Sequence, residues 1–175
     1  MFAIRHATAE DADRIAAVHV GSWRSAYAGM IPAEVIGALD ENARASFWSR
    51  HIGDDGWPVF VAEGHREIVG FASCIPCRDP DLAGASVCEL ATIYLVERVG
   101  RRGIGTSLLE RCVGDATHRG FDAMTLWVLE ANVRARAFYA SRGFRLDGTR
   151  KHDARLEADE VRMRAALPLA HARWG

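Results

Sequence analysis

Hydrophobic positions follow helical spacing in the first third of the chain and strand spacing after it. Residues 2–7 predict a short strand, and Thr8 with Asp11 three positions later forms a helix capping box ahead of "DADRIAAVHVGSW". Pro32 suits the first turn of a second helix, whose helical character continues through "FWSRHI" until "GDDGW". The apolar segments "PVFVAEG" and "EIVGFASC", on either side of "GHR", then predict a β-hairpin.

Strands and helices alternate in the second half of the chain. The segment "SVCELATIYL" at 86–95 is apolar on both faces, as in a central strand. A helix with one apolar face begins near Ile104 and ends at Gly120. "DAMTLWVL" predicts another buried strand, and "NVRARAFYASR" a helix closed by Gly143. Two final strands, "FRLDGT" and "EVRMRAAL", would flank a charged, solvated loop at 149–160. This order of elements predicts a mixed sheet in an α/β or α+β fold.

The composition is that of an ordinary globular protein, with 49% hydrophobic and 26% charged residues among 175. This length suits one domain, which we expect to span residues 1–175. No basic segment followed by an apolar run opens the chain, and no stretch approaches the roughly 18 apolar residues of a membrane span. We therefore expect a cytoplasmic protein with no membrane partner.

Charge is unevenly divided along the chain, although the formal net charge is only −1. Residues 1–88 hold 7 Lys and Arg against 12 Asp and Glu, whereas residues 89–175 hold 15 against 11. A basic half could hold an anion and an acidic half could attract a cation, although chance would also produce this difference. The near-zero total disfavours a nucleic-acid-binding protein, which usually has a basic surface.

The four cysteines do not form a disulfide framework in a chain of this length. Cys74 and Cys77 make a C-x-x-C motif, but it ends a predicted strand and enters a loop that contains Pro and Asp. A zinc site would need a second such motif or paired histidines, and the 7 histidines are scattered. We therefore expect no metal site and no redox site.

The segment "GRRGIGTSLL" at 100–109 lies between a predicted strand and a predicted helix. Unpaired N–H groups at a helix start bind anions, and Gly103 and Gly105 would let a ligand approach the backbone. Arg101 and Arg102 add charge and donors suited to phosphate. A P-loop would need a lysine here, and a dinucleotide fingerprint would need another glycine spacing, early in the chain. The remaining alternative is a plain helix start with surface arginines.

A second group of polar residues lies on the following predicted helix. Asn132, Arg136 and Tyr139 are spaced i, i+4 and i+7, so they share one helix face. Taken singly, Asn132 is most simply an N-cap and Tyr139 a half-buried core residue. Because they follow the glycine loop by one strand, they can also be read together with that loop as one pattern.

The two segments together resemble the GNAT superfamily of N-acetyltransferases. Its central motif is a strand, then [Q/R]-x-x-G-x-[G/A], then a helix, and "ELATIYLVERVGRRGIGTSLL" matches the strand, the loop glycines and the helix. "LWVLEANVRARAFYASRGF" is similar to the family's next strand and helix, with the pattern N-x-x-A-x-x-F-Y-x-x-x-G-F. Gly100 stands where the family usually has Gln or Arg. The resemblance implies a mixed, mostly antiparallel central sheet of about six to seven strands, flanked by about four helices.

The resemblance also implies acetyl-CoA as the acetyl donor. The pantetheine arm would pair with the backbone near Ile93 and Leu95, and Asn132 would hydrogen-bond to that arm. Arg101 or Arg102 would replace the family's usual Gln or Arg. The pyrophosphate would lie on the backbone N–H groups of Arg102, Gly103, Ile104, Gly105 and Thr106.

In this family an amine attacks the thioester directly, and the resemblance implies that Tyr139 protonates the leaving thiolate. The amine must lose a proton, and Glu89 is the candidate base. Strand alternation would place Glu89 on one face with Ala91, Ile93 and Leu95, where apolar neighbours suit a proton acceptor near neutral pH. The alternative is a structural carboxylate paired with an arginine.

Acceptor contacts are expected from the N-terminal helices. His19, Trp23 and Tyr27 recur at i, i+4 and i+8, and the last two lie near a helix break. Trp23 and Tyr27 are therefore candidate acceptor-binding residues, although core packing is the simpler explanation for Trp23. The acidic first half of the chain would suit a cationic amine.

These features predict an acetyl-CoA-dependent N-acetyltransferase whose acceptor is the primary amine of a small molecule. One alternative is a protein acetyltransferase that acts on N-terminal amines or lysines. An alternative of another class is a non-catalytic acyl-CoA-binding sensor, although a sensor would need neither Tyr139 nor Glu89. Similar proteins commonly form homodimers, but no interface is legible in the sequence.

Overall fold

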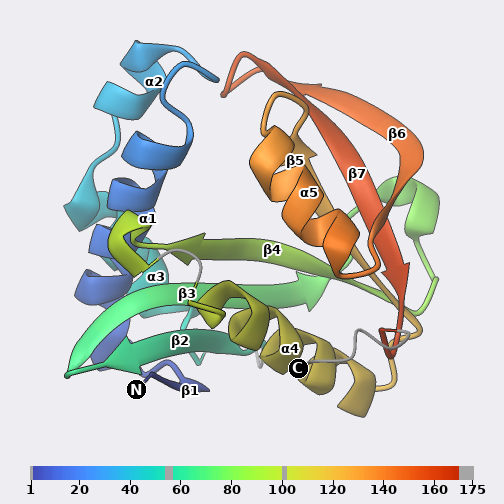
Figure 1. The fold of residues 1–175 in the computed structure, drawn as a ribbon, viewed down its shortest axis with the longest axis horizontal. Coiled ribbons are helices and arrows are strands. Elements are labelled where there is room, and N and C mark those ends of the chain that lie inside the picture. The colour runs from blue at the N-terminus through green and yellow to red at the C-terminus, as the bar shows by residue number, and fades with distance from the viewer. Residues whose placement is uncertain (1, 54–56, 100–101, 170–175) are drawn as a thin grey trace.

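The computed structural model describes residues 2–53, 57–99 and 102–169, which form a seven-stranded sheet with helices on both faces (Figure 1). The strands are β1 (Ala3–His6), β2 (Val59–Gly64), β3 (Glu67–Pro76), β4 (Val87–Leu95), β5 (Ala123–Leu129), β6 (Arg145–Asp153) and β7 (Ala158–Ala166). The helices are α1 (Ala12–Ala26), α2 (Ala33–Gly37), α3 (Glu41–His51), α4 (Ile104–His118) and α5 (Val133–Ser141). The predicted fold class is confirmed. No helix in the described part of the chain is long and apolar enough to cross a membrane.

The sheet has one parallel pair among antiparallel neighbours. Its strands are ordered β1-β2-β3-β4-β5-β7-β6, and only β4 and β5 run in the same direction. A parallel pair needs a crossover connection, which α4 supplies. The β4–β5 pair therefore joins an N-terminal part of the sheet, β1–β4, to a C-terminal part, β5–β7.

Two apolar clusters lie on opposite faces of the sheet. On one face, which we call the α4 face, α4, α5 and Phe144 just beyond α5 pack against the central strands. On the other, which we call the α1 face, α1 and α3 cover β2 and β3. Neighbouring residues of β3 serve both clusters, because Phe71 points to the α1 face and Ala72 to the α4 face.

The single helix predicted after Pro32 is wrong, since the structure has two helices there, α2 and α3. The Asp40 side chain accepts a hydrogen bond from the Ala43 N–H (2.9 Å) and caps a new helix. This cap gives the chain a place to turn between the two helices, which accounts for five α-helices where about four were expected.

The solvated loop predicted at 149–160 is also wrong. Most of this segment extends β6 and β7, and only residues 154–157 form the turn between them. Lys151 opposes Glu160 and forms an ion pair with it, and in the next pair His152 Nδ1 lies 2.8 Å from Asp159 Oδ1. Such cross-strand charge pairs stabilise a hairpin that has little apolar surface.

The core on the α4 face predicts that truncating two leucines will lower the stability of the protein to different extents. Leu108 of α4 is fully buried, whereas Leu146 of β6 is 50% exposed. We expect Leu108→Ala to lower the free energy of unfolding by about 2–5 kcal/mol, because it leaves a cavity in the core. Leu146→Ala removes the same atoms at the surface and should change it by less than about 0.5 kcal/mol. Urea unfolding measures both, and equal destabilisation would contradict this packing.

Candidate active site

β4 and β5 run side by side for only three residue pairs and then separate. Residues 87–89 of β4 pair with residues 123–125 of β5. Farther along, within the described residues, β4 pairs with β3 alone and β5 with β7 alone. Figure 1 shows the two strands diverging, with β4 running across the molecule and β5 running up beside β7. We call this place the β4–β5 fork, and it leaves backbone groups on one edge of β4 without a strand partner.

A β-bulge at Ala91 sets the direction of the side chains along β4. The register with β3 shifts at this residue, which has no partner there, so the alternation of the strand changes. Ile93 and Leu95 therefore lie on the α4 face, whereas Glu89 lies on the α1 face. The prediction that these residues share one face is wrong, because strict alternation makes no allowance for a bulge.

The backbone of Ile93 and Leu95 faces the fork. The Val96 N–H donates to the Val69 carbonyl on β3 (2.9 Å), and backbone groups of an antiparallel strand alternate in direction. The groups of Leu95 and Ile93 consequently point away from β3. The Ser22 hydroxyl on α1 donates to the Leu95 carbonyl (2.8 Å), which fixes this edge of β4 to α1. The other backbone N–H and C=O groups of Ile93 and Leu95 form a short ladder with which an extended, amide-containing ligand can pair.

The start of α4 lies at the same fork. Gly103 is its N-cap and has a φ of 77°, a left-handed conformation that favours glycine. A Cβ on Gly105 would lie 3.1 Å from Leu95 Cδ1 and 3.7 Å from Phe138 Cζ, so α4, the end of β4 and α5 meet here. The first N–H groups of the helix have no partner within it and can hold an anion.

The charges around this helix start also suit an anion. The first turn of α4 contains no acidic residue, and Arg102 is exposed immediately before the N-cap. The second predicted arginine, Arg101, lies outside the described residues, as does Gly100. Among the residues that the structure describes, Arg102 is therefore the positively charged side chain nearest in sequence before the first turn of α4.

α5 brings two predicted residues to the fork. Asn132 is its N-cap, since Oδ1 accepts from the Ala135 N–H (3.0 Å), and its NH₂ group has no partner among the described residues. Tyr139 is 8% exposed and packs against the rings of Phe138 and Phe144. Burial, with a smaller contribution from Tyr94, raises the pKa of Tyr139 well above its usual range, so its phenol stays protonated at neutral pH. A protonated phenol can act as a general acid.

A family model of the acetyltransferase (GNAT) family matches residues 23–144, which is more than half of the chain. The chain belongs to this family. The Bacillus subtilis protein named "Uncharacterized N-acetyltransferase YuaI" is 36% identical over 134 residues, which cover 75% of this chain and 74% of the relative. This GNAT protein is accordingly an N-acetyltransferase, as the sequence predicts.

Two solved structures of acetyltransferases share the fold. The ribosomal-protein-alanine N-acetyltransferase from Brucella melitensis has a TM-score of 0.74 and 26% identity, covering 94% of this chain and 99% of its own. A GNAT superfamily phosphinothricin acetyltransferase from Sinorhizobium meliloti, in complex with AcCoA, has a TM-score of 0.73 and 26% identity, covering 94% and 88%. Their names include a protein acceptor and a small-molecule acceptor, so the shared fold serves both.

On the α1 face of this GNAT protein, aromatic side chains adjoin the end of β4. The Tyr27 hydroxyl lies 3.5 Å from the Tyr94 hydroxyl, and the ring of Trp23 packs edge-on against Tyr27. Burial raises the pKa of both tyrosines. The structure therefore brings Trp23 and Tyr27 together, as their helical spacing predicts, and adds Tyr94. Sequence reasoning missed Tyr94, because its face becomes clear only once the bulge in β4 is known.

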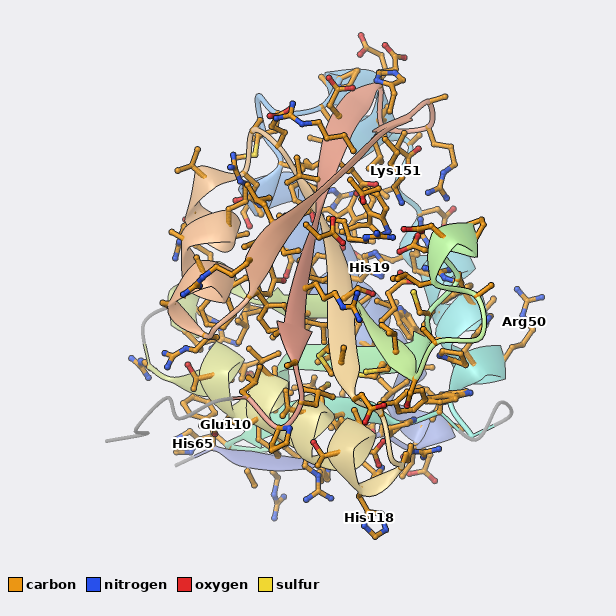
Figure 2. All side chains as sticks on the ribbon, turned by 90° about the vertical axis from the view of Figure 1, so that its right-hand side faces the viewer. His19, Arg50, His65, Glu110, His118 and Lys151 are labelled. Carbon is orange, nitrogen blue, oxygen red and sulfur yellow. The ribbon has the colours of Figure 1, made fainter. Side chains whose placement is uncertain are left out.

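Trp23, Tyr27 and Tyr94 form what we call the aromatic wall, and His19 packs against it. Its ring stacks on Tyr94, and its Nδ1 accepts a hydrogen bond from Trp48 Nε1–H (3.2 Å). Nε2 has no hydrogen-bond partner in the described part of the chain. His19 lies within the body of the molecule, whereas His118 projects outward (Figure 2). Burial, with a smaller effect of Arg44, lowers the pKa of His19 to about 4, so the imidazole is neutral at pH 7.

The candidate base Glu89 is held in an ion pair. Arg78 Nη2 and Nε lie 2.6 Å and 3.2 Å from its two carboxylate oxygens. Glu89 is 5% exposed, but the Arg78 side chain is 69% exposed. The pairing with an arginine, left open by the sequence, is therefore present. The ion pair does not exclude Glu89 as a base for an acceptor on the α1 face, because its carboxylate lies on that face and its partner Arg78 is at the surface.

The depressed pKa of His19 predicts a pH dependence of stability. The unfolded chain binds a proton near pH 6.5, whereas the folded chain does so only near pH 4. The contribution of neutral His19 is complete above pH 6.5 and is lost as the pH falls toward 4. It should fall by about 2 kcal/mol between pH 7 and pH 5.

Urea unfolding at pH 7 and pH 5 measures this change. His19→Gln keeps an acceptor for the Trp48 N–H but does not titrate, so its loss of stability between the two pH values should be smaller than that of the wild type. His118→Gln at the exposed end of α4 is the control and should behave as the wild type. Equal losses in the wild type and His19→Gln would contradict the assignment.

Proposed function

We propose that this GNAT protein transfers an acetyl group from acetyl-CoA to the primary amine of a small molecule. The observation that carries the proposal is the meeting of three elements at the β4–β5 fork. The start of α4 offers N–H groups for phosphate, the edge of β4 offers a backbone ladder, and α5 offers a protonated phenol. Acetyl-CoA has a matching order of parts, namely pyrophosphate, amide-containing arm and thioester.

Each part of acetyl-CoA has a defined partner in the proposed complex. The pyrophosphate lies on the first N–H groups of α4, between Arg102 and Thr106, with help from the loop arginines. The pantetheine arm pairs with the backbone of Ile93 and Leu95 and accepts a hydrogen bond from the NH₂ group of Asn132. The AcCoA bound by the Sinorhizobium relative supports this choice of donor.

The acceptor nitrogen must lose two protons in all, and the leaving thiolate must gain one. The ammonium form of the acceptor transfers a proton to Glu89, directly or through water, and the neutral nitrogen then attacks the thioester carbonyl. The C–S bond breaks as the new C–N bond is completed. Tyr139 gives its proton to the thiolate and regains one from the positively charged nitrogen, which becomes the amide. Positioning of the two reactants supplies most of the rate enhancement, with N–H groups stabilising the transient oxyanion.

The aromatic wall favours a small acceptor over a peptide. Trp23, Tyr27 and Tyr94 pack on one another, and Tyr27 and Tyr94 also share a hydroxyl contact. A peptide would need an open groove along this face, whereas a small amine needs only a pocket bounded by rings and a few polar groups. The amine of a small molecule is thus the acceptor class we propose.

We expect Tyr139→Phe to lower kcat by about 100-fold, because general acid catalysis contributes roughly that much, while leaving the Kd of acetyl-CoA unchanged. Acetyl-CoA-dependent thiol release is measured with polyamines, amino acids, aminoglycosides and short peptides, against a blank without acceptor. Calorimetry gives the Kd. Equal turnover of the mutant would remove Tyr139 from the acid role, and release with peptides alone would replace the small acceptor by a protein.

Gly105 offers a separate test of the binding loop. Gly105→Val places methyl groups against Leu95 and Phe138, which should displace the first turn of α4 from β4 and α5, so the Kd of acetyl-CoA should rise at least about tenfold. Gly114→Ala, in the same helix, meets nothing within 4 Å and should leave the Kd unchanged. Equal affinities of the two variants would place acetyl-CoA elsewhere.

A further inference from the structure

The ammonium group of Lys151 rests on an aromatic ring and a carboxylate. Its Nζ lies 4.0 Å from the centre of the Trp127 ring and 3.2 Å from Glu160 Oε2. An aromatic face beside a carboxylate is the combination that proteins use to hold alkylammonium groups. Trp127 and Glu160 thus form an ammonium site, which we call the Trp127–Glu160 site, and Lys151 occupies it from within the chain. In Figure 2, Lys151 lies against the body of the molecule, whereas Arg50 extends away from it.

The Trp127–Glu160 site lies on the α1 face, beside the fork. Glu160 pairs in register with Leu129, the last residue of β5, and Trp127 pairs with Arg162 of β7. Both side chains lie on the face opposite the α4-face core, which receives the intervening residues of these strands. Leu129 lies four residues beyond Thr125, and Ile93 lies four residues beyond Glu89, the partner of Thr125, so Glu160 lies across the fork from the end of β4 that carries Tyr94. The charge of Glu160 also contributes to the raised pKa of Tyr27 and of Tyr94.

Several carboxylates lie on the same face as the site. The buried Arg162 guanidinium lies 3.1 Å from Asp79, 2.6 Å from Asp81 and 2.6 Å from Asp147. Three carboxylates share one guanidinium, and Glu160 is a fourth carboxylate on the same face. The charges of Arg78 and Arg164 also act on Asp79 and Asp81, and Arg155, which pairs with Asp153, acts on Glu160. A ligand cation that replaced Lys151 would keep Glu160 paired.

The Lys151 ammonium can leave while the backbone pairing of β6 with β7 stays in place. Its side chain is 44% exposed, whereas that of Glu160 is only 13% exposed. The long lysine side chain can therefore swing into solvent, while the carboxylate and the Trp127 ring stay in place. A ligand ammonium would regain the same two contacts, so the exchange replaces one cation by another.

We propose that the Trp127–Glu160 site binds a second ammonium group of the acceptor and that Lys151 occupies the site until the acceptor replaces it. The inference rests on the proposed function and narrows its acceptor to small molecules with two amino groups. The attacking nitrogen must be neutral, so a nitrogen that stays paired with Glu160 as an ammonium is a different one.

The test compares amines of equal length that differ in one charge, namely putrescine with butylamine and cadaverine with pentylamine. The wild type, Glu160→Gln and Lys151→Met are assayed by thiol release. Asp159→Asn is the matched control, because that carboxylate is 65% exposed and pairs with His152 instead. The wild type should favour each diamine by about tenfold in kcat/KM, as expected for a partly buried charge contact. Glu160→Gln should abolish this preference, Lys151→Met should increase it, and Asp159→Asn should leave it unchanged.

The opposite effects of Glu160→Gln and Lys151→Met on the diamine preference distinguish a role in ligand recognition from a role in holding the hairpin together. If the ion pair only held β6 to β7, removing either partner would change the rates of diamine and monoamine alike. Turnover of amines with no diamine preference in the wild type would overturn this inference and leave the proposed function standing. No turnover of any amine would overturn both. If Glu160→Gln does not fold, Lys151→Met decides, and an unchanged preference in that variant overturns the inference.

Discussion

The separation of β4 from β5 is the constraint on which the rest of the structure depends. Each strand is held by its other neighbour, β4 by β3 and β5 by β7, so the two parts of the sheet diverge after three residue pairs. Backbone groups of Ile93 and Leu95 are thereby left without a strand partner in the middle of a sheet. Such groups cost free energy unless water or a ligand pairs with them. The Ser22 hydroxyl pairs with one of them, and the others remain for a ligand.

The fork also divides the chemistry between two faces. The α4 face supplies the helix start, with no acidic residue in its first turn, and the protonated phenol of Tyr139. The α1 face supplies aromatic rings and the carboxylates Glu89 and Glu160. An anionic donor and a cationic acceptor would therefore meet at the fork from opposite sides. This division follows the faces of the sheet and not the halves of the chain, because both carboxylates come from the second, basic half.

The sequence was sufficient for the parts that depend on local patterns. Apolar periodicity and glycines predicted most strands and helices, and the loop at Gly103 with the helix after Asn132 indicated the family. It was insufficient where distant contacts decide. The bulge at Ala91 depends on pairing with β3, and it moved Glu89 to the other face. The charged β6–β7 hairpin depends on cross-strand ion pairs such as Lys151–Glu160, and no local apolar pattern predicts those. Tyr94 and Trp127 went unnoticed as site residues for the same reason.

Amide hydrogen exchange with and without CoA tests the role of the fork most directly. The amides of Ile93, Leu95 and the first turn of α4 should exchange more slowly when CoA is present, because the ligand pairs with them. The Val96 amide, already bonded to the Val69 carbonyl, serves as an internal reference. Protection at the fork with little change at Val96 is the predicted result. Unchanged exchange at the fork and at α4, under conditions where CoA is bound, would contradict the placement of the donor there.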